Sequence, residues 1–186
     1  MEKKYEARHI FMALGICVLV ATPLLLFFVP QVMAKIIYAS PDLWVVVPQN
    51  KSYYAYGAGF LLLALALFLV YIFEMKKVPV VLSLICLALS GASLYMASHT
   101  YKSISYHGVA YSPLFSLEDY TYSWEEVDKV IYHRKRNLKQ SDYEFVFRDG
   151  SRVQFKENLY FLEVKHYVME MLKQKNIEME TKLAGD

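Results

Sequence analysis

Three long runs of apolar residues dominate the first hundred positions of the chain. They extend from Ile10 to Val29, from Tyr53 to Phe73 and from Val78 to Ala97. The first run has no charged residue, and as a helix it is about 30 Å long, which matches the hydrocarbon core of a bilayer. We therefore expect three transmembrane helices within residues 10–97, preceded by a basic N-terminal segment, residues 1–9.

The first run has a second interpretation. Lys3, Lys4 and Arg8 precede it, as the positive region precedes the apolar part of a secretory signal peptide. The run is longer than the usual apolar part of a signal peptide, and no small-residue cleavage site follows promptly. We therefore expect this segment to be retained as a membrane span.

The connection between the first two runs, residues 30–52, is unusually apolar for a loop. Tyr38 and Trp44 carry amphipathic rings that suit the membrane interface. We expect this connection to lie on the bilayer surface, with a short helix followed by an extended piece from Leu43 to Val47. A docking groove for a partner is the alternative.

After Ser98 the apolar pattern changes from helical to alternating, which predicts β-strands. The strongest signal is a hairpin, because the alternating segments Tyr143–Phe147 and Arg152–Phe155 flank Asp149-Gly150. We expect both turn residues to supply positive φ angles.

Towards the end of the chain the apolar residues recur at spacings of three and four, which predicts an amphipathic helix from about Leu159 to Lys175. We expect residues 177–186 to form a flexible tail. Strands followed by one helix predict a small α+β domain over residues 98–176. The helical stripe consists of Leu159, Phe161, Leu162, Val164, Val168, Met171 and Leu172.

Residues 100–175 resemble part of a known family of small bacterial multi-pass membrane proteins, those with a C-terminal bacterial pleckstrin-homology-like (PH-like) domain. The likeness lies in YSWEEVDKV, in the paired strands EFVFRDGSRVQF and in the closing helix. The resemblance implies a curved antiparallel PH-like sheet capped by a C-terminal helix, together with membrane association. It implies no catalytic residue. The hairpin loop that is basic in lipid-binding pleckstrin domains corresponds here to His107-Gly108, with only Lys102 nearby.

Composition supports a membrane protein and argues against nucleic acid as a partner. The chain is 56% hydrophobic and 16% aromatic, above the values usual for soluble domains. Residues 98–186 hold thirteen Lys and Arg against fourteen Asp and Glu. Nucleic-acid binding draws on a concentrated basic surface, and this part of the chain is nearly neutral.

Basic residues near the ends of the runs predict the orientation. Lysines and arginines are commoner on the cytoplasmic side of membrane spans. One side of the predicted membrane region carries five of them and the other carries three, which favours a cytoplasmic N-terminus and places the C-terminal domain on the outer face. The first group is Lys3, Lys4, Arg8, Lys76 and Lys77, and the second is Lys35, Lys51 and Lys102.

Six residues are candidates for contact with lipid headgroups or with a partner. Four form the local basic cluster of the chain, for which a solvated loop between strands is the alternative. Trp124 and Trp44 are candidate interface anchors, and for Trp124 a place in the core is the alternative. The basic cluster consists of Arg134, Lys135, Arg136 and Lys139.

The sequence predicts no catalytic, cofactor or metal site. The five histidines lack the spacing of zinc-binding motifs, and no nucleophile motif or phosphate-binding loop occurs. Cys17 and Cys86 lie inside apolar runs, where pairing across helices stays open.

We therefore expect a non-enzymatic module in which three helices hold a PH-like domain at the bilayer surface, where it binds a protein partner in the cell envelope. Immunity or secretion is a possible setting. The alternative is an accessory subunit of an envelope enzyme or transporter that works through its helices.

Overall fold

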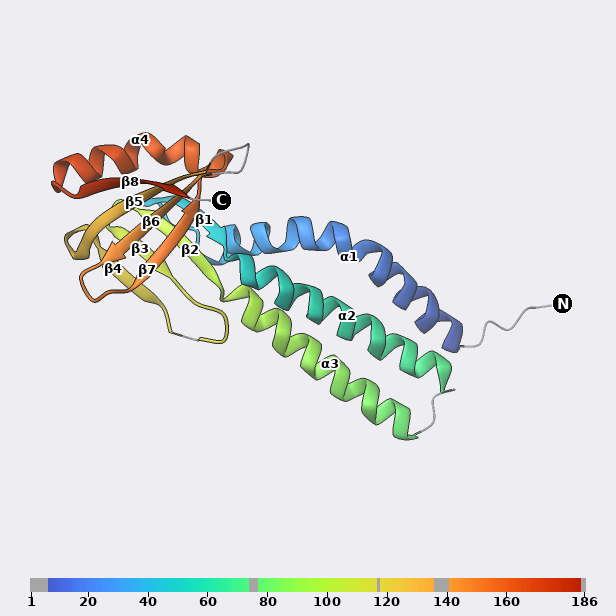
Figure 1. Cartoon of the computed structure of the whole chain (residues 1–186). Coiled ribbons are helices and arrows are strands. Elements are labelled where there is room, and N and C mark those ends of the chain that lie inside the picture. The colour runs from blue at the N-terminus through green and yellow to red at the C-terminus, as the bar shows by residue number, and fades with distance from the viewer. Residues whose placement is uncertain (1–6, 74–76, 117, 136–140, 185–186) are drawn as a thin grey trace. The chain divides into compact units, whose positions relative to one another are not determined.

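The computed structural model of the chain describes residues 7–73, 77–116, 118–135 and 141–184 (Figure 1). It divides the chain into two compact units. The helical unit comprises Met1–Ala39, Val47–Tyr101 and Ser112–Leu117. The two-sheet domain comprises Ser40–Val46, Lys102–Tyr111 and Glu118–Asp186.

The helical unit contains helices α1 (Ala7–Ile37), α2 (Asn50–Ile72) and α3 (Lys77–Ser98). Each is long and apolar enough to cross a membrane, as the sequence predicts. Helix α1 continues past Val29 to Ile37, because Pro30 removes only one backbone hydrogen bond and the residues after it still form helix. The orientation residues Lys3, Lys4 and Lys76 lie outside the described residues.

Helix α2 packs against both α1 and α3. Three serines of α3 donate hydrogen bonds to backbone carbonyls of α2, at 2.7 Å from Ser90 to Gly59 and at 2.8 Å from both Ser83 and Ser93. Gly59 permits this approach, since a Cβ atom there would lie 2.7 Å from Leu94. Small residues thus hold the two helices close together, as is common in membranes.

The first sheet has the strand order β1-β2-β3-β4. Its strands are β1 (Leu43–Pro48), β2 (Tyr101–Ser105), β3 (Gly108–Tyr111) and β4 (Tyr120–Ser123). The extended piece predicted at Leu43–Val47 is therefore confirmed as strand β1, and its position at the bilayer surface stays a prediction. It is a strand because its backbone hydrogen-bonding groups pair with β2, which follows α3 in the chain.

The second sheet has the order β7-β6-β5-β8, and helix α4 precedes its last strand (Figure 1). The predicted hairpin is confirmed, with Phe145 opposite Val153. Its turn differs in detail, because only Gly150 has a positive φ angle, of 85°. The elements are β5 (Val127–Lys135), β6 (Asp142–Phe147), β7 (Arg152–Lys156), α4 (Leu159–Gln174) and β8 (Glu178–Ala184).

The predicted flexible tail at 177–186 is wrong over β8, which pairs with β5 in parallel. The amide of Ile177 donates to the carbonyl of Leu172 at 2.9 Å, and that of Asn176 donates to Lys173 at 3.2 Å. With Asn176 at a φ of 52°, these bonds form the Schellman ending of α4 and turn the chain back along the sheet. The sheet is consequently mixed rather than wholly antiparallel. Residues 185–186 lie outside the described residues.

The core of the domain gathers side chains from both sheets and from α4. Phe161, Val164, Val168, Met171 and Leu172 of the predicted helical stripe are buried there. Leu159 and Leu162, the other two residues of that stripe, are exposed. The chain thus combines three long apolar helices with a largely antiparallel two-sheet domain and a helix near its C-terminus. Side chains that are almost wholly buried include Ile104, Val109, Trp124, Val130, Phe145 and Phe147.

Candidate interaction surface

The structure places only part of the predicted basic cluster. Arg134 is exposed near the end of β5, where it pairs with Leu183 of β8. Lys135 is the last residue of that strand. Arg136 and Lys139 lie outside the described residues. The described part of the cluster is therefore the end of a strand rather than a loop, and its contact with headgroups stays a prediction.

Trp124 is a core residue, so its interpretation as an exposed anchor is wrong. It is 2% exposed, and its indole Nε1 donates to the backbone oxygens of Ser105 at 3.2 Å and Tyr106 at 3.0 Å. A capping box between Ser123 and Glu126 begins the short turn that carries it. The indole thus satisfies its polar group inside the domain, as a buried tryptophan requires.

Trp44 belongs to the two-sheet domain, and its role as an interface anchor stays a prediction. Its ring stacks on Tyr167 of α4, with centroids 5.5 Å apart, and lies 6.0 Å from the ring of Trp124. The residue is half-buried. Part of the residue therefore stays exposed while its ring packs beside α4.

Strand alternation gathers charges on the outer face of the second sheet. Val130 and Phe145 pair across β5 and β6 and point into the core, so the neighbouring Ile131 and Glu144 point to the opposite face. Titratable side chains gather on this outer face, and we call six of them the charged face. They are Lys129, His133, Glu144, Arg152, Glu180 and Lys182.

Glu144 lies at the centre of the charged face, with a side chain that is 9% exposed. Its Oε2 lies 2.7 Å from His133 Nε2, and its Oε1 lies 3.6 Å from a guanidinium nitrogen of Arg152. A carboxylate with so little water contact requires partners of this kind. The two flanking strands therefore hold Glu144 in one geometry.

A second ion pair links the edge strand to this face. Lys129 Nζ lies 2.6 Å from Glu180 Oε1, and Lys182 Nζ lies 3.8 Å from Glu180 Oε2. The hydrogen bond with Glu180 raises the pKa of Lys129, and the same bond lowers the pKa of Glu180. Both groups therefore stay ionised across the physiological range of pH.

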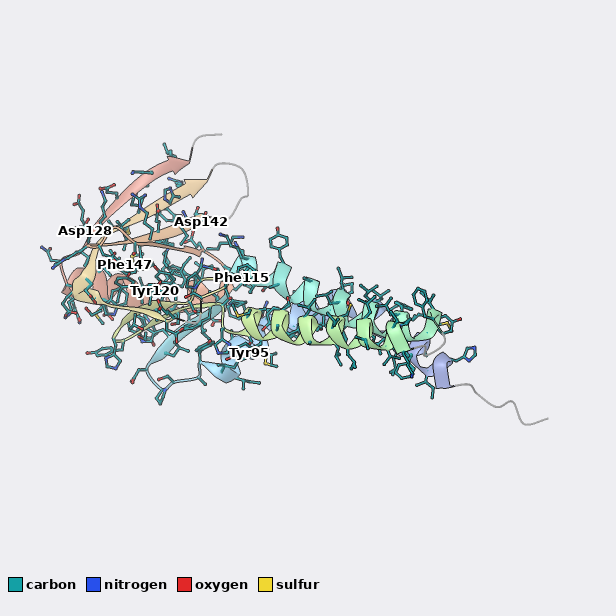
Figure 2. The ribbon with its side chains drawn as sticks, turned by 90° about the horizontal axis from the view of Figure 1, so that it is seen from below. Tyr95, Phe115, Tyr120, Asp128, Asp142 and Phe147 are labelled. Carbon is teal, nitrogen blue, oxygen red and sulfur yellow. The ribbon has the colours of Figure 1, made fainter. Side chains whose placement is uncertain are left out.

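Tyrosines line another part of the domain. Tyr120, Tyr111, Tyr122 and Phe147 form a ladder of nearly parallel rings, whose ends, Tyr120 and Phe147, are labelled in Figure 2. The Tyr122 hydroxyl donates to Asp149 at 2.7 Å, which ties the hairpin turn to β4. Burial raises the pKa of Tyr122 to about 12, so the hydroxyl remains a donor at physiological pH.

The charged face carries both signs of charge. Cations and carboxylates of the face are interleaved and paired, which suits a protein surface of complementary pattern better than a polyanion. Among the described residues, no group of three His, Cys, Asp or Glu side chains is placed to hold a metal ion. Cys17 and Cys86 are free.

The chain matches no protein-family model, and no curated protein matches its sequence.

Sequence reasoning missed the charged face because its members lie on four strands, one of which, β8, follows α4 and was not predicted as a strand. The predicted hairpin could have revealed two members of the charged face. The hairpin register places Glu144 and Arg152 on the same face of β6 and β7, since both lie one residue away from positions that alternate into the core. The pairing of His133 with Glu144 depends on the register of β5, which the sequence does not reveal.

Proposed function

We propose that this protein is a membrane-anchored, non-enzymatic binding module whose two-sheet domain recognises a protein partner in the cell envelope. The helices supply the anchor, and the charged face supplies the recognition surface. Trp44, half-buried beside α4, is a second contact that a partner can reach.

One observation carries this proposal, namely that chain segments on either side of the α2–α3 hairpin build one sheet. Strand β1 precedes α2, and strand β2 follows α3. Only His99 and Thr100 separate α3 from β2. Two covalent connections to the helices, of which one is only two residues long, support a domain that stays close to the membrane.

The PH-like identity of the domain is part of the proposal. Two sheets that enclose a core around Trp124 and Phe145, with α4 near the end of the chain, support it. We further propose that the N-terminus is cytoplasmic and that the domain lies on the outer face, on the basis of the lysines and arginines that flank the spans. A phosphatase reporter that acts only outside the cytoplasm, fused after Asp186, tests this sidedness and should be active.

Photocrosslinking in native membranes tests the recognition surface. A benzoylphenylalanine at Gln154, which is exposed on the outer face opposite Glu144, should give one dominant crosslinked product. The same group at Thr121, an exposed position on β4, is the matched control and should not give that product. Charge reversal by Arg152→Glu should weaken the crosslink from Gln154.

Two results would count against this proposal. Equal crosslinking from Gln154 and Thr121 would mean that the charged face is not the contact surface. Crosslinks that arise only from positions on α1 or α3 would favour the alternative of an accessory subunit working through its helices. In the described helices, the hydroxyls of Ser83, Ser90 and Ser93 are engaged by α2, which makes them packing groups.

A further inference from the structure

The turn between β3 and β4 has a backbone conformation that its sequence disfavours. The amide of Ser116 donates to the carbonyl of Pro113 at 3.1 Å, which closes a four-residue turn. Phe115, its third residue, has a φ angle of 68°. A turn of this kind normally carries Gly or Asn at that position, and a bulky residue there is a genuine outlier. Such strain is a reason to look for a function.

The ring of Phe115 is mostly exposed, so packing within the protein does little to compensate for the backbone strain. Phe115 is 77% exposed, although residues on its N-terminal side are held in place by packing and hydrogen bonding. Leu114 packs against the cluster of Ala55, Tyr56, Phe60 and Ala97 in the helical unit. Two residues before Leu114, Ser112 is buried, and its amide donates to the carbonyl of Tyr101 at 3.0 Å. Phe115 therefore projects from a segment that is held in place.

Two members of the cluster that holds Leu114 lie near the ends of the membrane helices. Ala55 is in the second turn of α2, and Ala97 is next to the last residue of α3. At 1.5 Å per residue these positions lie within about 8 Å of the helix ends, which is the depth of the interface in a bilayer with a hydrocarbon core of about 30 Å.

Other aromatic side chains are exposed at this level. Tyr54, near the start of α2, is 81% exposed, and Tyr95, near the end of α3, is 55% exposed. Figure 2 shows Phe115 and Tyr95 towards the same end of the helices. Exposed rings at the ends of spans are typical of the aromatic belt that sits among lipid headgroups.

We propose that Phe115 inserts into the interfacial layer of the bilayer, so that the β3–β4 turn is a membrane contact in addition to the three helices. The occupant that covers the ring is phospholipid, at the boundary between headgroups and acyl chains. Burial of the ring there offsets the strained backbone. This inference rests on the part of the proposed function in which the helices span a membrane, and it is independent of any protein partner.

Fluorescence quenching in liposomes tests the inference. The full chain, with Cys17→Ala and Cys86→Ala, receives Phe115→Cys and an environment-sensitive label, and is reconstituted in phosphatidylcholine with phosphatidylglycerol. Lipids with a nitroxide near the headgroup should quench this label more than lipids with a nitroxide near the chain end. Aqueous iodide should quench it weakly. Since position 115 is exposed, the substitution leaves the core packing unchanged.

Two control positions separate the possible failures. A label at Leu87→Cys, halfway along α3, should be quenched most by the deep nitroxide, and a label at the exposed Asp128→Cys should be quenched by iodide. If no nitroxide quenches the label at Leu87, the membrane assignment itself fails. If the label at Leu87 behaves as expected and the label at 115 responds only to iodide, or to neither quencher, the insertion of Phe115 is overturned and the proposed function stands.

Discussion

Gly108 has the tightest surroundings of the described glycines. Its φ angle is 155°, and a Cβ atom there would lie 1.9 Å from the carbonyl oxygen of Tyr122 on the neighbouring strand. No rotamer relieves this clash, since both atoms are tied to backbone. The close approach of β3 to β4 thus depends on a missing side chain.

Gly108→Ala should destabilise the domain by about 2–4 kcal/mol, because β3 and β4 must separate to admit the methyl group. Thermal unfolding of the full chain in mild detergent measures this loss. Gly91→Ala is the matched control, because nothing lies within 4 Å of a Cβ atom at that position and alanine favours a helix. Equal unfolding temperatures for the two variants would contradict the geometry at Gly108.

Glu157 joins α4 to the second sheet. Its carboxylate accepts hydrogen bonds from Lys165 at 2.8 Å, from Tyr132 at 3.1 Å and from Tyr143 at 3.4 Å. Partial burial opposes its ionisation, but these donors outweigh burial and hold its pKa below the ordinary value of 4.5. Its ionised form therefore contributes stability above pH 4.5, which is lost as the pH falls from there through the lower folded pKa.

Glu157→Gln should lower the stability by about 1–3 kcal/mol at neutral pH, since it removes a charged acceptor from three donors. It should also reduce the loss of stability of the chain below pH 4.5. Denaturant unfolding at several pH values measures both effects. Glu163→Gln, on the exposed side of α4, serves as the control and should retain the acid dependence of the unmodified chain.

At the scale of elements, the α2–α3 pair depends on close approach of its backbones. Gly59→Val should destabilise the pair by about 1–3 kcal/mol, because its methyl groups would overlap Leu94 and separate the carbonyl of Gly59 from the Ser90 hydroxyl. Unfolding in detergent micelles monitors the loss, and Gly91→Val is the control on a face with free space. If the control is the more harmful variant, the packing face has been misassigned.

Strand β8 depends on the left-handed residue at the end of α4. Asn176→Gly should preserve or improve stability, whereas Asn176→Val should lower it by about 1–3 kcal/mol, because β-branched residues avoid a φ of 52°. Hydrogen exchange gives the local measurement. Amides of β8 that pair with β5 should exchange slowly in the unmodified chain and faster in the valine variant. Fast exchange in the unmodified chain would restore the prediction of a flexible tail.

At the scale of the whole molecule, the shared sheet constrains the topology. Because β1 and β2 pair, the connection between α1 and α2 must lie on the same side of the membrane as the two-sheet domain. Cysteines at Asp42 and Gln154, in the background without native cysteines, should react with an impermeant maleimide from one side of sealed vesicles. Lys77→Cys, at the start of α3, should react from the other side. Labelling of Asp42 and Gln154 from opposite sides would contradict the pairing of β1 with β2.

The sequence by itself determined the parts of this protein that depend on local patterns. The three apolar runs predict the helices, because a bilayer requires each span to satisfy its own backbone hydrogen bonds. The hairpin at Asp149-Gly150 and the buried stripe of α4 follow from periods of two and of 3.6 residues.

Tertiary structure alone decided which distant segments pair. Residues 43–48 form a strand because β2, far along the chain, offers free backbone groups, and residues 178–184 form one because β5 does. The alternation in EMETKLA was visible, but a polar segment after a helix has no local signal that distinguishes an edge strand from a tail. Burial of Trp124 and the contact of His133 with Glu144 likewise depend on how separate strands pair. That pairing is set by contacts between segments, so no single segment of the sequence predicts it.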